Sequence, residues 1–226
     1  MTKLLTVENI CVEIKKANEE EYHRGKSWEY CYGFFRNYKK FRNNNKLLDQ
    51  AALHLGFFLA SWGMLRGSSF LLQSNYKYYV PVVRVLIDPK YDDLWNVDYL
   101  NIKKQEKILG LLFNLNKELQ HVMKEKNGFN HKGPSDTLVT KIIMGTMGCV
   151  PAYDRYFKTG LKKFLKKNKE KRGINFSKKS FEKLLNFSRK DSILREIYKK
   201  SIPTINTGIK YPPMKLLDLY FWRLGQ

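Results

Sequence analysis

The residues best suited to chemistry lie in one segment, which reads KGPSDTLVTKIIMGTMGCVPAYDRYF over residues 132–157. Asp154 stands near its end, three residues after a proline and framed by tyrosines. A carboxylate in such a place can stabilise positive charge that develops on a sugar, or it can activate a water molecule. The structural alternative stays open: Asp154 caps a helix that begins near Tyr156, or it pairs with Arg155 or a lysine.

The same segment predicts a helix in front of Asp154. Gly133 and Pro134 indicate its start, because proline at the first helical position sacrifices no hydrogen bond. Apolar side chains recur at helical spacing over residues 138–147, and Gly148 followed by Pro151 predicts the end. A bare helix N-terminus offers backbone N–H groups and partial positive charge to a phosphate. We therefore expect a nucleic-acid backbone to contact Lys132, Gly133, Ser135, Thr137, Lys141 and Arg155.

Charge and composition point to a folded protein that attracts polyanions. Hydrophobic residues make up 43% of the 226 residues and aromatic residues 14%, which excludes a disordered basic tail. The 42 Lys and Arg residues against 21 Asp and Glu residues give a net charge of +21. Such a charge favours nucleic acid first and an acidic membrane surface second. A basic surface that serves only solubility is the remaining alternative.

The cysteines and the termini argue against several other classes of protein. The three cysteines are far apart and form no CxxC pair or Cys/His cluster, so we expect no metal and no cofactor. The chain has no apolar signal segment and no run of apolar residues long enough to span a membrane. We therefore expect a cytoplasmic protein with reduced thiols, no membrane contact and no obligate protein partner.

Helical periodicity dominates the chain and predicts an all-α fold. Apolar side chains recur at helical spacing over residues 47–62 and 102–123, the second run ending near Gly128. Pro81 within YYVPVVRV favours a helix start over a strand. Pro212 opens a last helix whose sequence, MKLLDLYFW, is apolar almost all round and predicts burial. We expect residues 1–226 to form a single compact helical unit, which could divide into two helical subdomains.

Residues 157–200 form the most basic part of the chain. They hold 16 Lys and Arg residues against 4 Asp and Glu residues, a net of +12. Apolar residues still recur at helical intervals, which predicts two amphipathic helices around Gly173 with basic outer faces. We expect residues 158–200 to face a polyanion, although an ordinary solvated surface would show the same pattern.

The order of these features resembles the helix-hairpin-helix DNA glycosylase superfamily over residues 47–160. The matching parts are Gly133 at the hairpin, residues 138–147 in the helix, residues 148–151 at its exit, and Asp154. The usual glycine hairpin of the family is reduced here to HKGPSD, and the exit loop is shorter. The resemblance implies a helix-hairpin-helix-like element, a DNA-binding cleft and Asp154 as the catalytic carboxylate. Members that also cleave the strand carry a lysine where Thr137 stands, which implies base removal alone.

A second part of the resemblance concerns the loop that would fill the place of an extruded base. Residues 61–73 read SWGMLRGSSFLLQ, and Ser61 lies 93 residues before Asp154. Extruding a base costs a few kcal/mol, so such enzymes need a wedge and an aromatic pocket. The alternative role of Arg66 is a salt bridge to an acid such as Glu29. The expected base-flipping residues are Ser61, Arg66, Ser68 and Ser69, and the expected pocket walls are Trp62, Tyr153, Tyr156, Tyr220 and Trp222.

The leading hypothesis is a monofunctional DNA N-glycosylase that acts on a damaged or modified base in double-stranded DNA, in repair or in defence against phage. A non-enzymatic nucleic-acid-binding module is one alternative, and it would use the basic segment 158–200. A defence nuclease or toxin is another, and it would need clustered metal ligands. Asp92, Asp93 and Asp98 are the densest acids away from the N-terminus, but Asp92 and Asp93 are typical of a turn or helix cap.

Overall fold

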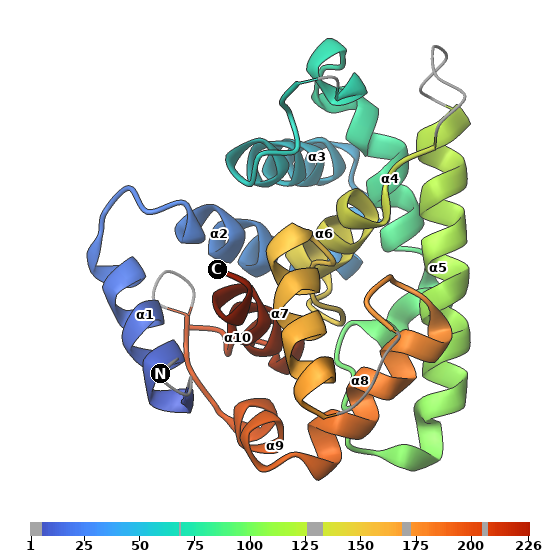
Figure 1. The fold of residues 1–226 in the computed structure, drawn as a ribbon. Coiled ribbons are helices and arrows are strands. Elements are labelled where there is room, and N and C mark those ends of the chain that lie inside the picture. Colours follow the sequence, from blue (N-terminus) through green and yellow to red (C-terminus); the bar gives the residue numbers. More distant parts are fainter. Residues whose placement is uncertain (1–5, 68, 126–132, 169–172, 205–207) are drawn as a thin grey trace.

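The computed structural model describes residues 6–67, 69–125, 133–168, 173–204 and 208–226, and within them the fold is all-α, as expected (Figure 1). An isolated antiparallel bridge between Pro203 and Lys210 is the one extended pairing in those ranges. Short 3-10 helices join several of the longer elements. The α-helices are α1 (Val7–Glu19), α2 (Gly25–Phe35), α3 (Asn45–Ser61), α4 (Tyr79–Leu86), α5 (Gln105–Glu125), α6 (Asp136–Thr146), α7 (Arg155–Lys167), α8 (Lys178–Lys190), α9 (Ser192–Lys199) and α10 (Pro213–Gly225).

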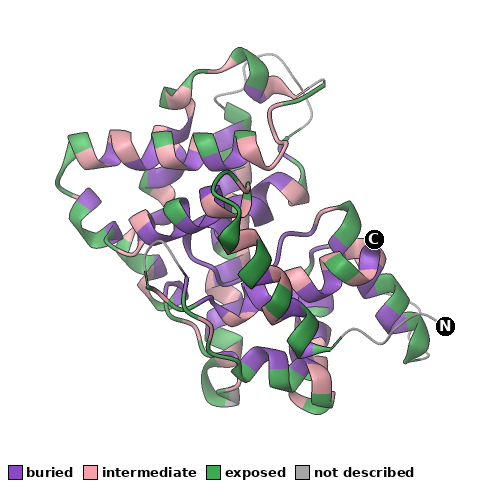
Figure 2. Ribbon diagram, turned by 90° about the vertical axis from the view of Figure 1, so that its left-hand side faces the viewer, coloured by how far each residue is buried: buried purple, intermediate pink, exposed green. Residues whose placement is uncertain are grey.

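Helix α6 forms the centre of the molecule. Every residue from Leu138 to Thr146 is buried, and α2, α3 and α5 all pack against the helix (Figure 1). A helix with apolar side chains on most of its faces requires such surroundings, since those faces do not suit water. The outer helices show the usual division between buried and exposed faces (Figure 2). The central position of α6 lets its first turns contact segments from distant parts of the chain.

Both ends of α6 carry recognisable capping groups. The side-chain oxygen of Ser135 accepts the backbone N–H of Leu138 at 3.2 Å, so the helix begins at Asp136. The expectation that Gly133 and Pro134 start the helix was therefore wrong by two to three residues. Gly148 ends it as expected, with a φ of +70° that glycine adopts without strain. The N–H groups of Gly148 and Met147 both donate to the carbonyl of Ile143, a common helix ending.

Two glycines allow α7 and α10 to cross in close contact. A Cβ atom on Gly160 would lie 1.9 Å from the carbonyl oxygen of Phe221. A Cβ atom on Gly225 would lie at the same distance from the carbonyl oxygen of Tyr156. Any larger residue would push the helices apart. The crossing thus fixes the end of α10 beside the start of α7.

The basic segment folds into three helices, α7, α8 and α9, rather than the two expected. Asp191 explains the extra boundary, because it ends α8 and its carboxylate accepts the N–H of Leu194 at the start of α9, at 3.0 Å. Gly173 lies between α7 and α8 with a φ of +118°, which agrees with its expected role as a break. The predicted exposure of basic side chains is confirmed on all three helices: exposed residues include Lys162, Lys163, Lys166, Lys167, Lys178, Lys179, Lys190, Arg195 and Lys199.

The remaining helix predictions are confirmed. Residues 79–86 form helix α4 rather than a strand, with Pro81 in its first turn, and Pro212 precedes the largely buried α10. Gly128 lies outside the described residues, as do His131 and Lys132, the first two residues of the expected hairpin HKGPSD. Among the described helices, none has the length and apolar character needed to cross a lipid bilayer.

Candidate functional site

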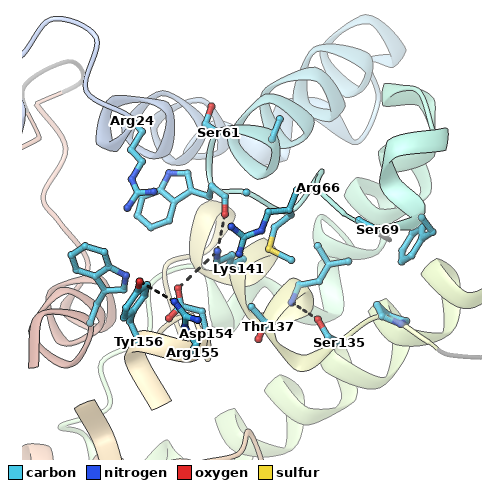
Figure 3. Close-up of a pocket in the computed structure, with 18 of the residues that line it drawn as sticks. Arg24, Ser61, Arg66, Ser69, Ser135, Thr137, Lys141, Asp154, Arg155 and Tyr156 are labelled. Atoms are coloured by element: carbon cyan, nitrogen blue, oxygen red, sulfur yellow. Dashed lines mark hydrogen bonds and ion pairs between the residues drawn. The ribbon is translucent and has the colours of Figure 1, made fainter. Parts of the chain in front are cut away.

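A cavity of about 1230 Å³ opens where the end of α3, the start of α6, the start of α7 and the end of α10 meet (Figure 3). These elements bring together residues that are far apart in the sequence. Ser68 and Lys132, which were also expected at the site, lie outside the described residues. The sequence-predicted residues that line the cavity are Ser61, Trp62, Arg66, Ser69, Gly133, Ser135, Thr137, Lys141, Asp154, Arg155, Tyr156 and Trp222.

The loop that leads into Asp154 is fixed by hydrogen bonds from two helices. Thr137 of α6 donates its hydroxyl to the carbonyl of Tyr153 at 2.8 Å, and the hydroxyl of Thr140 accepts the N–H of Tyr153 at 3.0 Å. Asp218 of α10 accepts the N–H of Ala152 at 2.9 Å. The loop is buried as well, so its backbone has little freedom to move. Asp154 is therefore presented at the cavity by a rigid support.

Asp154 has a structural role and also lines the cavity. One carboxylate oxygen, Oδ1, accepts the N–H of Phe157 at 3.0 Å, which caps α7. The other oxygen, Oδ2, lies 3.9 Å from Nζ of Lys141 (Figure 3). The side chain is 17% exposed. The capping and lysine-pairing alternative is thus confirmed, and it leaves one carboxylate oxygen for the cavity.

Lys141 is an unusual residue for a buried helix. Its side chain is 7% exposed, and its ammonium donates to the carbonyl of Trp62 at 2.9 Å. The ammonium also lies 5.8 Å from the centre of the Trp62 ring. Burial lowers the pKa of Lys141 from its ordinary value, and the negative charge of Asp154 opposes that shift. The lysine therefore links the loop after α3 to the start of α7 through the cavity wall.

A buried ion pair on α10 lies behind the cavity wall, and sequence reasoning missed it. Nζ of Lys215 lies 3.0 Å from Oδ2 of Asp218, and the two side chains are 3% and 4% exposed. The same ammonium lies 4.4 Å from the centre of the Trp62 ring and 5.4 Å from that of Trp28. Burial raises the pKa of Asp218, and Lys215 opposes the shift. The pair thus supports both Trp62 and the loop that Asp218 holds.

Cations and aromatic rings alternate along the rim of the cavity. The guanidinium of Arg24 lies 5.7 Å from the ring of Trp62 and 5.9 Å from that of Trp222. Trp222 meets Tyr156 edge-on at 5.6 Å. Arg155 lies 4.8 Å from the Tyr156 ring and donates to its hydroxyl at 3.0 Å. Sequence reasoning did not anticipate Arg24, which only the fold brings close.

The lining has a strong excess of positive charge. Among the described side chains that line the cavity, Arg24, Arg66, Lys141 and Arg155 carry four positive charges and Asp154 carries the one negative charge. The difference, four minus one, is +3. Guanidinium groups and aromatic rings together suit the phosphates and the bases of a nucleic acid.

Two expected pocket walls lie elsewhere. Tyr153 is fully buried and packs against Phe157 and Phe176 in the core. Tyr220 is 6% exposed and does not line the cavity. The expectation was wrong for both tyrosines, because the loop before α7 turns its aromatic side chain inward and α10 buries the face that carries Tyr220. Of the expected pocket walls, Trp62, Tyr156 and Trp222 line the cavity, and Phe70 adds a fourth aromatic ring.

The expected phosphate grip at the start of α6 also needs correction. This helix end is not bare, because Ser135 already accepts the N–H of Leu138. Asp136 places a negative charge in the first turn, where it opposes an anion. The hydroxyl proton of Thr137 is committed to the loop carbonyl of Tyr153. The cationic side chains are therefore better phosphate ligands than the helix end.

Of the expected base-flipping loop, Arg66 is the residue best placed to contact a ligand. It is exposed, lines the cavity and forms no ion pair with another described residue. The alternative partner Glu29 is buried and accepts the hydroxyl of Tyr211. The hydroxyl of Ser61 donates to the carbonyl of Phe57 at 2.9 Å. Ser69 caps a short 3-10 helix, so both serines are already partly occupied.

The described residues hold no group of three or more His, Cys, Asp or Glu side chains that could bind a metal ion. Asp92 pairs with Arg42, and Asp93 lies 2.7 Å from Lys107. Asp98 accepts the N–H of Leu100 at 2.9 Å. The three acids noted in the sequence thus contact three different partners.

Comparisons of the chain with protein families, with curated proteins and with solved structures give no match. The resemblance to the helix-hairpin-helix glycosylases therefore stays a hypothesis based on residues 133–154 and 61–69.

Proposed function

We propose that the protein is a monofunctional DNA N-glycosylase with Asp154 as its catalytic carboxylate. The observation that supports this most strongly is the composition of the cavity. One carboxylate lies on a wall with four cationic side chains and the aromatic rings of Trp62, Tyr156 and Trp222. These residues come from separate segments that the fold brings to one place. The substrate is double-stranded DNA with one nucleotide turned out of the stack.

The size of the cavity suits an extruded nucleotide. Pockets for small organic ligands enclose roughly 300–1,000 Å³. This cavity, at about 1230 Å³, is larger and has room for the nucleotide together with its flanking phosphates. Arg24, Arg66 and Arg155 would contact the phosphates on either side of the extruded nucleotide, because guanidinium groups bind phosphate oxygens in pairs. Arg66 would also fill the space that the base leaves.

The reaction breaks the bond between C1′ of the sugar and a ring nitrogen of the base. The bonding electron pair leaves with the base, and C1′ becomes positively charged. The available oxygen of Asp154 stabilises that charge and accepts a proton from the attacking water. The water oxygen bonds to C1′, and the proton passes on to the departing base. The products are free base and an abasic site in an intact strand.

The strand remains intact because no free amine takes part. Thr137 stands where strand-cleaving members of the superfamily carry a lysine, and its hydroxyl holds the loop carbonyl. Lys141 is tied to the carbonyl of Trp62 and to Asp154. We expect breaks to appear only after alkali treatment, and borohydride to trap no covalent complex.

Two variants of Asp154 separate catalysis from capping. Asparagine caps helices about as well as aspartate, so Asp154→Asn keeps the start of α7 but loses the negative charge. We expect it to bind DNA like the wild type, to melt somewhat lower because the buried ammonium of Lys141 loses the negative charge beside it, and to lose about 10²–10⁴-fold in the rate of abasic-site formation. Asp154→Ala should lose stability as well. Full activity of Asp154→Asn would reject the proposal and leave capping as the sole role.

The exposed lysines of α7 and α8 support a second candidate, a nucleic-acid-binding module without chemistry. Lys162, Lys166 and Lys179 are among the exposed cations on this face. Binding by such a face weakens steeply with salt, because phosphate contacts release counterions. This candidate predicts salt-sensitive binding that survives every substitution in the cavity, and no released base from any duplex.

A further inference from the structure

Resting on the proposed function, we infer that the substrate base is a keto base that departs as an anion, such as uracil or hypoxanthine, and not a cationic alkylated purine. The charges that line the cavity and the electron count of the reaction both favour this class of base.

The charged lining offers hydrogen-bond donors in large excess. Arginine and lysine carry only donors, and Arg24, Arg66, Lys141 and Arg155 supply the cationic groups. Asp154 is the one anionic acceptor among the described lining side chains, and its Oδ1 is already taken by the N–H of Phe157. Carbonyl oxygens on a base match such a surface. An amino group on a base would face donors and lose its hydrogen bonds to water without replacement.

The positive charge of the lining also favours a base that leaves as an anion. When a neutral nucleotide is cleaved, the electron pair makes the base an anion, and a lining of net +3 stabilises it as the charge develops. When a cationic alkylated purine is cleaved, the base leaves neutral and gains nothing from those cations. The same cations repel the alkylated base before the reaction begins.

Lys141 is the cation whose position gives it the largest effect on this preference, since it lies deepest beside Asp154. Its ammonium is 3.9 Å from Oδ2 of Asp154 and is nearly enclosed by protein. Weak solvent screening at such a site strengthens its effect on a nearby anion. Arg24, Arg66 and Arg155 are exposed, and water screens them more.

The test is a panel of otherwise identical duplexes under single-turnover conditions. Each carries uracil, hypoxanthine, 7-methylguanine or 3-methyladenine at one position, the last two being cationic within the nucleotide, and the released free base is quantified. We expect uracil or hypoxanthine to be released at least tenfold faster than either alkylated purine. Faster release of 7-methylguanine than of both keto bases would overturn the inference and leave the glycosylase proposal standing. Release of no base from any duplex would reject the glycosylase proposal, and the inference with it.

Substitutions at Lys141 test whether the charge causes the preference. Lys141→Met should slow release of the keto base by about 10²-fold, and Lys141→Arg should recover part of that loss. The matched control is Lys124→Met on α5, which removes an exposed charge that does not line the cavity. It should leave the rate unchanged. Equal effects of Lys141→Met on uracil and on 7-methylguanine would contradict the role of the charge, whereas melting curves and DNA affinity report any loss of folding.

Discussion

The buried ion pair of Lys215 and Asp218 is proposed to hold Trp62 and the loop before Asp154 in place, and its contribution to the free energy of unfolding can be measured. Lys215→Met and Asp218→Asn each remove one charge and keep the approximate size of the side chain. The asparagine side chain introduced by Asp218→Asn would keep an oxygen that can accept the N–H of Ala152, now at 2.9 Å from Asp218. The double variant removes both charges together. The three variants and the wild type form a double-mutant cycle.

The magnitude follows from how completely the pair is enclosed. Both side chains are at most 4% exposed, so removal of one partner strands the other charge in the protein interior. Such a loss costs about 3–5 kcal/mol, whereas removal of both charges is often nearly neutral. In a chain of this length 1 kcal/mol shifts the melting temperature by about 2–4 °C. Each single variant should thus melt about 6–20 °C lower, and the double variant should recover most of that loss.

The free energy of unfolding is measured by urea unfolding followed by circular dichroism. The rate of base release is measured separately, without urea, and is divided by the fraction of each variant that is folded. We expect a coupling free energy of about 2 kcal/mol or more, since each single loss exceeds the loss in the double variant. Additive losses would refute the pairing. Single losses below about 1 kcal/mol are typical of exposed ion pairs, and they would refute the burial. Either result would remove the proposed support of Trp62 and of the loop before Asp154.

Three further results are expected. Gly160→Ala should destabilise the protein by about 1–3 kcal/mol or more through overpacking, because its Cβ would lie 1.9 Å from the carbonyl oxygen of Phe221. The control Gly110→Ala has open space at the Cβ and should not be destabilised in this way. Equal melting temperatures of the two variants would contradict the close crossing of α7 and α10. In a pH–rate profile, the rate of base release should fall as pH rises through the lowered pKa of Lys141, because the lysine loses its positive charge there. Lys141→Arg should move that fall to higher pH. A fall at the same pH in both proteins would mean that another group causes the pH dependence. Lys166→Glu on the exposed face of α7 should reduce the slope of log affinity against log salt by about 1 if the lysine contacts a phosphate; an unchanged slope would place the DNA elsewhere.

Local signals were sufficient to predict much of the fold. Helical spacing identified α3, α5, α6 and α10, and Gly148 and Pro212 marked boundaries because their backbone preferences act locally. The third basic helix was missed although its signal was present: Asp191 is a typical N-cap residue, and Ser177 caps α8. The prediction of two helices was based on charge, apolar spacing and Gly173, and not on these capping residues.

The site was predicted only in part, for physical reasons. Asp154 and Trp62 were found because each stands next to a recognisable helix end. Lys215 and Asp218 were missed because MKLLDLYFW indicates an apolar helix, and a pair of opposite charges within it is compatible with burial only when the two side chains meet. Arg24 contacts Trp222 through tertiary packing that no local pattern encodes.

The most direct test of the central claim is mass spectrometry of a lesion-bearing oligonucleotide after one turnover with the wild type and with Asp154→Asn. We predict that the wild type yields an intact strand whose mass has fallen by the base and risen by one water. The Asp154→Asn variant should bind the same duplex equally well and return it unchanged. An unchanged mass with the wild type across the whole lesion panel, or the same loss of base with both proteins, would contradict the assignment of Asp154 as the catalytic carboxylate.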